Sequence, residues 1–209
     1  MIDFHIHSSY SDGEASIMEI ARKASSMKLE AIAVLDHGPY HPLGLTEKKT
    51  RKRKMEIEEA EATYGIEILD GVEVEIEGDG GLSIPGEFDL VLITSHSIIT
   101  PAEVHRFISA VKENRVDVIA HFGAFGFVEL GESELINMFL DIIESNRVAL
   151  ELNEAYRAPP DPVLELCMER EIMCSVGSDS HTVAGIGKIE WALKCMETYF
   201  KGRLIRWWE

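Results

Sequence analysis

Short apolar runs alternate with longer amphipathic runs along the whole chain. The runs at 31–35 and 90–93 lack polar alternation, which is typical of strands covered on both faces in a parallel sheet. The longer runs place apolar residues at helical spacing. The pattern predicts strands at residues 1–7, 30–36, 66–76, 89–96, 117–121, 147–153 and 172–177. It predicts helices at residues 16–28, 46–64, 101–114, 132–145, 161–170 and 185–200.

Local signals mark some of the ends of these elements. Ser16 is followed three residues later by Glu19, which is the pattern of a capping box at a helix start. Thr100 precedes Pro101, and proline is favoured at the first helical position. The Gly-Asp-Gly-Gly segment at 78–81 predicts a hairpin turn after the third strand.

Seven strand–helix units of this kind predict one α/β domain over residues 1–209. Two architectures fit a parallel sheet of this size, an open doubly wound sheet and a closed barrel. In a barrel the carboxyl ends of all the strands surround one centre. In an open sheet ligands bind only at the point where the strand order reverses. The position of candidate site residues therefore discriminates between the two.

Composition and charge narrow the possible partners. The chain is 45% hydrophobic, has no apolar run of membrane-spanning length and shows no signal-peptide pattern, so we expect a cytoplasmic protein without a membrane partner. Three cysteines without CxxC spacing are interpreted as buried reduced thiols. The aromatic segment 204–209 is interpreted as packing on the outside of the fold, with a docking or dimer contact as the alternative.

The formal net charge of −17 disfavours broad nucleic-acid binding, because such a surface repels a phosphate backbone. A basic run at 48–54 is the local exception. It is interpreted as a solvated helix face that pairs with glutamates one turn away, or as a patch that attracts an anionic substrate.

Side chains of the kinds that bind metals occur at the ends of all seven predicted strands. His5 and His7 lie two residues apart on a strand and therefore share a face. The HxH pair alone is equally consistent with two ordinary polar residues on a half-buried strand. However, six of the eight histidines lie at strand ends, which favours the barrel. The candidates in chain order are His5, His7, Asp12, His37, Glu73, His96, His121, Asn153, Asp179 and His181.

Imidazole and carboxylate ligands without thiolates suit zinc, manganese or iron. Nine of these candidates are metal-competent, which is too many for one ion. At roughly four to five ligands per ion, with a shared carboxylate, they fit two or three divalent ions. Clusters of this kind hydrolyse phosphate esters, because one ion lowers the pKa of a bound water while others bind the phosphoryl oxygens.

The motifs together resemble those of the PHP family, named for polymerase and histidinol phosphatase. The resemblance runs from residue 5 to residue 181 with the motifs in the family's order. It implies a distorted seven-stranded (β/α)7 TIM-like barrel with a trinuclear metal site. The motifs are His5-x-His7-Ser8, Tyr10-Ser11-Asp12-Gly13, Asp36-His37-Gly38, Gly71-Val72-Glu73, Ser95-His96, His121 and Gly177-Ser178-Asp179-Ser180-His181.

The resemblance also implies which residues bind which ion. A first ion takes His5, His7, Glu73 and Asp179, and this group holds the metal-bound hydroxide. Glu73 bridges to a second ion bound by His96 and His121. A third ion takes Asp12, His37 and His181. The position of Asp12 is a histidine in some members and an aspartate in others, and the aspartate favours manganese or iron at the third ion.

Other polar residues near these motifs have open interpretations. Asp3 either orients an imidazole from below or is a buried residue satisfied by backbone, and Asp36 is interpreted as structural. Asn153 is a candidate for binding substrate or a metal-bound water. Arg157 is a candidate for binding a substrate phosphate, although a loop arginine is more often solvated. His41 is a further candidate for a substrate contact.

The sequence therefore predicts a phosphoric ester hydrolase that acts on a small phosphorylated metabolite by attack of a metal-bound hydroxide on phosphorus. Within the family, histidinol phosphatase is one alternative, which the short chain disfavours. A nuclease or nucleotide phosphatase is another. A non-catalytic RNA-binding scaffold, as in a protein subunit of archaeal ribonuclease P, is disfavoured by the acidic surface and by the complete set of metal-competent positions.

Overall fold

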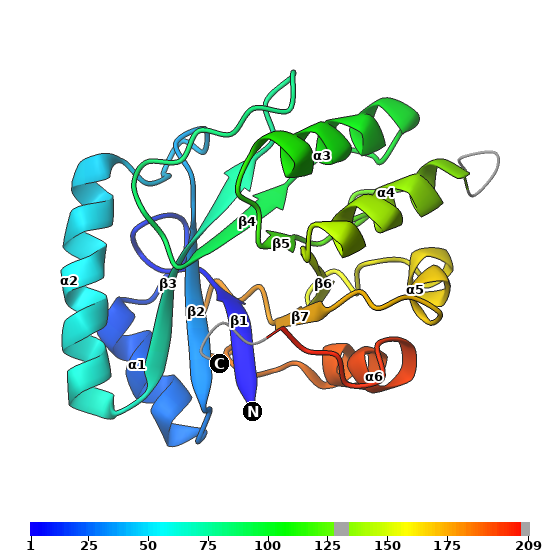
Figure 1. Ribbon diagram of the computed structural model, residues 1–209. Helices are drawn as coiled ribbons and strands as arrows, with labels where there is room; N and C mark the ends of the chain where they lie inside the picture. Colours follow the sequence, from blue (N-terminus) through cyan, green and yellow to red (C-terminus); the bar gives the residue numbers. More distant parts are fainter. Residues whose placement is uncertain (128–133, 206–209) are drawn as a thin grey trace. The chain divides into compact units, whose positions relative to one another are not determined.

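A computed structural model describes residues 1–127 and 134–205 (Figure 1). The strands are β1 (Ile2–Ile6), β2 (Ala31–His37), β3 (Glu67–Glu75), β4 (Leu90–Thr94), β5 (Val118–Ile119), β6 (Ala149–Asn153) and β7 (Cys174–Gly177). The helices are α1 (Ile17–Ser26), α2 (Glu47–Tyr64), α3 (Pro101–Glu113), α4 (Glu134–Ser145), α5 (Asp161–Cys167) and α6 (Glu190–Tyr199).

All the predicted strands and helices are present, and most of their ends agree closely with the prediction. The main difference is at α6, which begins later than expected because the preceding residues form turns around Gly185 and Gly187. Residues 132–133 of the predicted fourth helix lie outside the described residues. The Ser16 capping box forms, and the side chain of Thr100 caps α3.

The predicted hairpin at 78–81 is wrong. A turn does form there, with the Glu77 N–H donating to the Gly81 carbonyl at 3.0 Å. However, residues 76–89 are all described and contain no strand, so the chain reaches β4 through an irregular segment. A glycine-rich segment indicates that the chain reverses locally, but it does not indicate that the flanking residues pair as strands.

The strands form one seven-stranded sheet in sequence order, from β1 to β7. Strand β2 pairs in parallel with β1 and with β3, and β5 pairs in parallel with β6. A parallel bridge between Ile6 and Ser180 brings the chain after β7 beside β1. Sequential parallel strands with this closing contact confirm the predicted α/β class with a TIM-like (β/α)7 barrel topology.

The described residues divide into two compact units, so the expectation of one domain over 1–209 stays a prediction. Unit 1 comprises Met1–Val74, Ser83–Leu92 and Gly177–Ile189. In unit 1, helices α1 and α2 pack against each other (Figure 1). Strands β1 and β2 are buried along their whole length, with Phe4 and Ile32 fully inaccessible. This core fixes the strand ends that carry the polar residues discussed below.

Unit 2 comprises the described residues of Glu75–Leu82, Ile93–Val176 and Glu190–Glu209. Its helices pack in sequence order, α3 on α4, α4 on α5 and α5 on α6 (Figure 1). Phe122 stacks on Phe139 at 4.7 Å between ring centroids, and both rings pack edge-on against Phe107. This aromatic core anchors the loop that follows β5.

The remaining sequence predictions concern the cysteines, the termini and membranes. The three cysteines are free and buried, as predicted. Leu204 and Ile205 extend the chain beside Cys174 of β7, whereas residues 206–209 of the aromatic tail lie outside the described residues. Among the described helices, none combines the length and apolar character required to cross a bilayer.

Candidate metal centre

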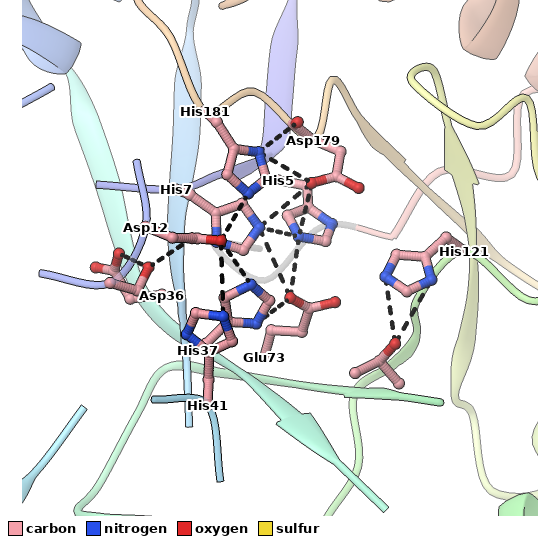
Figure 2. A network of polar contacts seen from close by, with 12 residues as sticks. His5, His7, Asp12, Asp36, His37, His41, Glu73, His121, Asp179 and His181 are labelled. Atoms are coloured by element: carbon pink, nitrogen blue, oxygen red, sulfur yellow. Dashed lines mark hydrogen bonds and ion pairs between the residues drawn. The ribbon is translucent and has the colours of Figure 1, made fainter. Parts of the chain in front are cut away.

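Unit 1 collects seven of the predicted ligands at one end of its strands (Figure 2). His5 lies in β1 and His7 follows that strand directly. His37 is the last residue of β2 and pairs in register with Glu73 of β3. Parallel strands end at the same edge of a sheet, so these side chains meet although they are far apart in sequence. The seven residues are His5, His7, Asp12, His37, Glu73, Asp179 and His181.

Four of them form a compact group, called cluster A, which consists of His5, His7, Glu73 and Asp179. The Nε2 atoms of His5 and His7 lie 3.0 Å apart. The Oε2 atom of Glu73 lies 3.8 Å and 3.7 Å from these two nitrogen atoms. The Oδ1 atom of Asp179 lies 3.7 Å and 3.3 Å from them. All four side chains are buried.

The spacing within cluster A fits a bound cation. Ligand atoms about 2.1 Å from a tetrahedral zinc ion lie about 3.4 Å from one another. The five distances given above, from 3.0 Å to 3.8 Å, scatter around that value. Two imidazole nitrogens that face each other between two carboxylates are also the donor set that zinc, manganese and iron accept.

A second group, called cluster B, consists of Asp12, His37 and His181. The Oδ2 atom of Asp12 lies 3.4 Å from Nε2 of His37 and 3.3 Å from Nε2 of His181. His7 connects the two clusters, because its buried Nδ1 atom has no hydrogen-bond partner and lies 3.6 Å from Oδ1 of Asp12. An unsatisfied buried imidazole nitrogen beside a carboxylate is consistent with a cation site.

His41 lies at the edge of cluster B. Its ring stacks on His37 at 4.3 Å, and its Nε2 atom lies 3.9 Å from Oδ2 of Asp12. Its Nδ1 atom accepts a hydrogen bond from the N–H of Leu43, which in the neutral ring leaves the proton on Nε2. His41 therefore presents a donor toward the cluster, which suits contact with an anionic oxygen better than metal ligation.

The pKa shifts of Asp179, Asp12 and His7 favour cation binding, whereas the shift of His37 opposes it. Burial would raise the pKa of Asp179, but the neighbouring imidazoles outweigh it and hold this pKa well below its usual range. The same balance lowers the pKa of Asp12. Burial lowers the pKa of His7, so its ring is neutral and has a lone pair for a metal. Burial also acts to lower the pKa of His37, but the hydrogen bond to Glu73 reverses the shift and raises it.

Two buried aspartates position the loops that carry the ligands. Asp3 accepts hydrogen bonds from the N–H groups of Ser178 and Gly187, at 2.9 Å and 2.8 Å. The backbone interpretation of Asp3 is the one that the structure supports, and the residue anchors the segment that contains Asp179. Burial raises the pKa of Asp3 despite these bonds.

Asp36 is structural, as predicted. It accepts hydrogen bonds from the N–H and the hydroxyl of Ser8 and from the hydroxyl of Ser11, at 2.6–2.9 Å. Its other partner is the guanidinium of Arg53 at 2.8 Å. Burial would raise the pKa of Asp36, but Arg53 and the two hydroxyl groups hold it below its usual range. Asp36 thereby fixes the loop that presents Asp12.

The solvated interpretation of the basic run 48–54 is wrong for two of its members. Arg53 is fully buried and donates hydrogen bonds to Asp36, to Asp70 and to the Gly71 carbonyl. The Nζ group of Lys49 donates to the carbonyls of residues 10, 43 and 44, at 2.9, 2.7 and 3.1 Å. A run of basic residues in a sequence does not indicate which of its side chains faces the protein interior. Two others pair one turn along α2 as expected, Arg51 with Glu47 and Lys52 with Glu56.

Unit 2 contains the remaining predicted site residues. Nδ1 of His96 lies 2.6 Å from Oε2 of Glu75, and a carboxylate in this position orients an imidazole that binds a metal through its other nitrogen. His121 is buried, its Nε2 atom lies 3.2 Å from the Thr94 hydroxyl, and its N–H donates to Glu151 at 2.7 Å. The rings of His96 and His121 lie 5.3 Å apart.

Sequence reasoning did not single out Glu75 and Glu151. Each lies two residues from a predicted site residue on the same strand, and that spacing was the available signal.

Asn153 is the last residue of β6, and Arg157 lies in the turn that follows this strand. The side-chain amide of Asn153 donates to Glu151 at 3.1 Å and accepts from the N–H of Tyr156 at 3.1 Å. Arg157 is exposed and has a positive φ of 51°.

Two candidate ligands are also in the left-handed region, Asp179 with a φ of 54° and His121 with a φ of 24°. Such conformations cost energy in residues other than glycine and cluster at functional sites.

The chain is similar to several known proteins. The chain is 30% identical over 195 residues to the DNA polymerase/3'-5' exonuclease PolX of Bacillus subtilis (strain 168), across 87% of the chain but only 34% of that protein. The chain thus spans about a third of the length of this relative. It is 28% identical over 220 residues to a probable phosphatase of Acetivibrio thermocellus, across 94% of the chain and 86% of that protein.

The fold is shared with a solved structure, the histidinol phosphate phosphatase of Lactococcus lactis in complex with zinc, L-histidinol and phosphate. The two chains superpose with a TM-score of 0.68 at 20% identity, covering 98% of this chain and 94% of the other. A family model described as the PHP domain matches residues 3–117. The chain therefore belongs to the PHP domain family.

Proposed function

We propose that this protein is a metal-dependent phosphoesterase that hydrolyses a small phosphorylated metabolite. The observation that carries the proposal is the geometry of cluster A, where buried nitrogen and oxygen atoms are spaced as ligands of one cation. The PHP family membership and the probable phosphatase of Acetivibrio thermocellus support the same reaction class. We propose that it acts in the cytoplasm, where its three buried thiols stay reduced.

The protein's part in the reaction is to hold two or three divalent cations, which we propose to be zinc, manganese or iron. When bound, such ions lower the pKa of water and offset charge on phosphoryl and leaving oxygens. Cluster A would hold one ion and cluster B another. His96 and His121 would hold a third together with Glu73, as the family resemblance implies. The residues proposed as ligands are His5, His7, Asp12, His37, Glu73, His96, His121, Asp179 and His181.

Two residues are proposed to contact the substrate, and a third is proposed to position one of them. His41 would donate a hydrogen bond from its Nε2–H group to a phosphate oxygen. This agrees with the role of its Nδ1 atom as a hydrogen-bond acceptor. Arg157 would pair with the phosphate through its planar guanidinium. The amide of Asn153 connects Glu151 of β6 to the N–H of Tyr156, so we propose that it acts by holding the loop that presents Arg157.

Metal removal tests the proposed function. We expect complete chelation to abolish phosphate release from an aryl phosphate, and added manganese or zinc to restore it. Elemental analysis must show that the stripped protein retains no metal. Full activity in that protein would refute the mechanism.

A 3'-5' exonuclease activity is the second candidate, because the PolX relative bears that name. The net charge of −17 opposes it, since a nucleic-acid backbone is repelled by an acidic surface. Phosphate release and shortening of a labelled oligonucleotide, measured on the same preparation, separate the two activities. A screen of nucleotides, sugar phosphates, histidinol phosphate and phosphorylated amino acids, each with manganese, zinc, iron and magnesium, would then identify the substrate.

A further inference from the structure

Three consecutive loops of unit 2 expose a large apolar side chain. They follow β4, β5 and β6, and they carry Ile98, Phe125 and Tyr156, which are 54%, 38% and 47% exposed. Each lies two to four residues after a predicted site residue at the end of its strand. Exposed apolar side chains that lie next to one another can mark a ligand-binding surface, whereas singly scattered ones need no explanation.

The two aromatic members are in contact with each other and with the imidazoles proposed as ligands. The ring centroids of Phe125 and Tyr156 lie 5.2 Å apart, at an interplanar angle of 52°. Phe125 lies 5.3 Å from His96, and Tyr156 lies 5.5 Å from His121. We call Phe125 and Tyr156 the aromatic platform. The platform thus adjoins the candidate metal ligands of unit 2 and is also partly exposed to solvent.

The Tyr156 side of the platform is held by its backbone before any ligand arrives. Asn153 and Ala158 exchange two backbone hydrogen bonds, of 2.9 Å and 3.3 Å, around the turn that contains Tyr156. The N–H of Tyr156 also donates to the side chain of Asn153. A preformed turn reduces the ordering cost that a ligand would otherwise meet.

The Phe125 side is equally constrained. Hydrogen bonds from Ala124 to the His121 carbonyl and from Gly126 to the Gly123 carbonyl, of 3.0 Å and 3.1 Å, close the turn around Phe125. Gly123 has a φ of 85°, and a Cβ atom there would lie 2.9 Å from Cδ of Pro160. The position therefore requires glycine, and the loop has little freedom to bury Phe125 elsewhere.

We propose that the aromatic platform binds a planar aromatic group of the phosphorylated substrate, whose phosphate then lies toward His96 and His121. This inference rests on the proposed phosphoesterase function and names its substrate class, an aromatic phosphomonoester. Aromatic rings gain attraction from one another beyond the burial of their area, and a saturated group does not. Three side chains cover far less than the roughly 800 Å² per partner of a stable protein interface, which disfavours a protein as the occupant.

A pair of ligands matched in size tests the proposal by binding alone. Benzylphosphonate and cyclohexylmethylphosphonate have the same carbon skeleton and differ only in ring saturation, and neither is hydrolysed. With metal-loaded protein and calorimetry, we expect the benzyl compound to bind roughly two- to tenfold more tightly. Phe125→Leu and Tyr156→Leu are expected to bring that ratio toward one. Tyr199→Leu, the same change on the surface of α6, is expected to leave it unchanged.

Equal affinity for the two phosphonates, no binding of either at millimolar concentration, or an unchanged ratio in both platform variants would overturn the platform. Thermal unfolding of each variant shows that it is folded. Phosphate release from benzyl phosphate and cyclohexylmethyl phosphate is measured separately. Failure to hydrolyse either ester would count against the phosphoesterase function. The phosphonate affinities would still test, independently, whether the platform binds an aromatic group.

Discussion

The Oε2 atom of Glu73 faces three imidazoles. It lies 2.9 Å from Nδ1 of His37, 3.8 Å from Nε2 of His5 and 3.7 Å from Nε2 of His7. The carboxylate is thus in contact with members of both clusters of unit 1. A single residue placed in this way can hold more than one cation, because each of its two oxygens can bind an ion.

We therefore expect Glu73→Ala to lose more than one equivalent of bound metal in elemental analysis. Glu67→Ala is the matched control, since Glu67 begins the same strand but is exposed. The control is expected to retain the wild-type metal content. If the Glu73 variant kept all of its metal, the shared role would be refuted.

Gly13 is a second position where the structure depends on a single atom, the Cβ atom that glycine lacks. A Cβ atom at this residue would lie 2.3 Å from the carbonyl oxygen of His7 and 2.8 Å from the N atom of Ser8. Both neighbours are backbone, so the loop that presents Asp12 would have to move. We expect Gly13→Ala to lower the free energy of unfolding in urea by about 1–3 kcal/mol, as overpacking does, and to weaken cation binding at cluster B. Gly78→Ala, where a Cβ atom meets nothing within 4 Å, should have little effect on either. Identical behaviour of the two variants would contradict the steric argument.

At the scale of elements, helix α2 differs most from what its sequence indicates. Its charged surface suggests a solvated helix, yet the fully buried Arg53 projects from it to Asp36 and Asp70. Through Asp36 the helix is connected to Ser8 and Ser11, and so to the loop that carries Asp12. One helix thus supports three chain segments of unit 1.

Arg53→Met is expected to lower the free energy of unfolding by about 3–5 kcal/mol, because it leaves two buried carboxylates without their cation. Arg51→Met is the control on the same helix. The side chain of Arg51 is exposed and forms an ion pair with Glu47 at 3.8 Å, so its loss is expected to cost less than about 0.5 kcal/mol. Urea denaturation measures both changes. Similar stability of the two variants would show that the buried network contributes nothing.

The sequence predicted the elements well because some strands, such as β2 and β4, are almost continuous apolar runs and most helices have an apolar face. It singled out the four residues that meet in cluster A because their imidazoles and carboxylates lie at or near the carboxyl ends of strands. It could not predict that Arg53 is the buried member of its basic run, since every member has the same charge and only packing selects one. Nor could it predict the pairing of Glu75 with His96, which brings together residues of two strands.

In the whole molecule, the acidic net charge and the candidate metal centre both affect the equilibrium between the folded and the unfolded chain. A net charge of −17 repels itself in the compact state, and divalent cations offset part of that repulsion. The residues of clusters A and B come from the segments 5–12, 37–73 and 179–181 of unit 1. A cation bound there holds together parts of the chain that separate on unfolding, and the unfolded chain offers no comparable site.

We therefore expect manganese or zinc at about 100 times its dissociation constant to stabilise the metal-free protein by about 2.7 kcal/mol. In a chain of this length, that raises the melting midpoint by about 5–10 °C. Calorimetric scans at matched ionic strength separate this effect from screening, because sodium chloride relieves repulsion without occupying the clusters. Glu73→Ala is expected to reduce the shift caused by the divalent ion and to leave the response to sodium chloride as it is. If sodium chloride alone produced the full shift in the wild-type protein, the cation would act through net charge, and the ligand geometry of clusters A and B would not explain its effect.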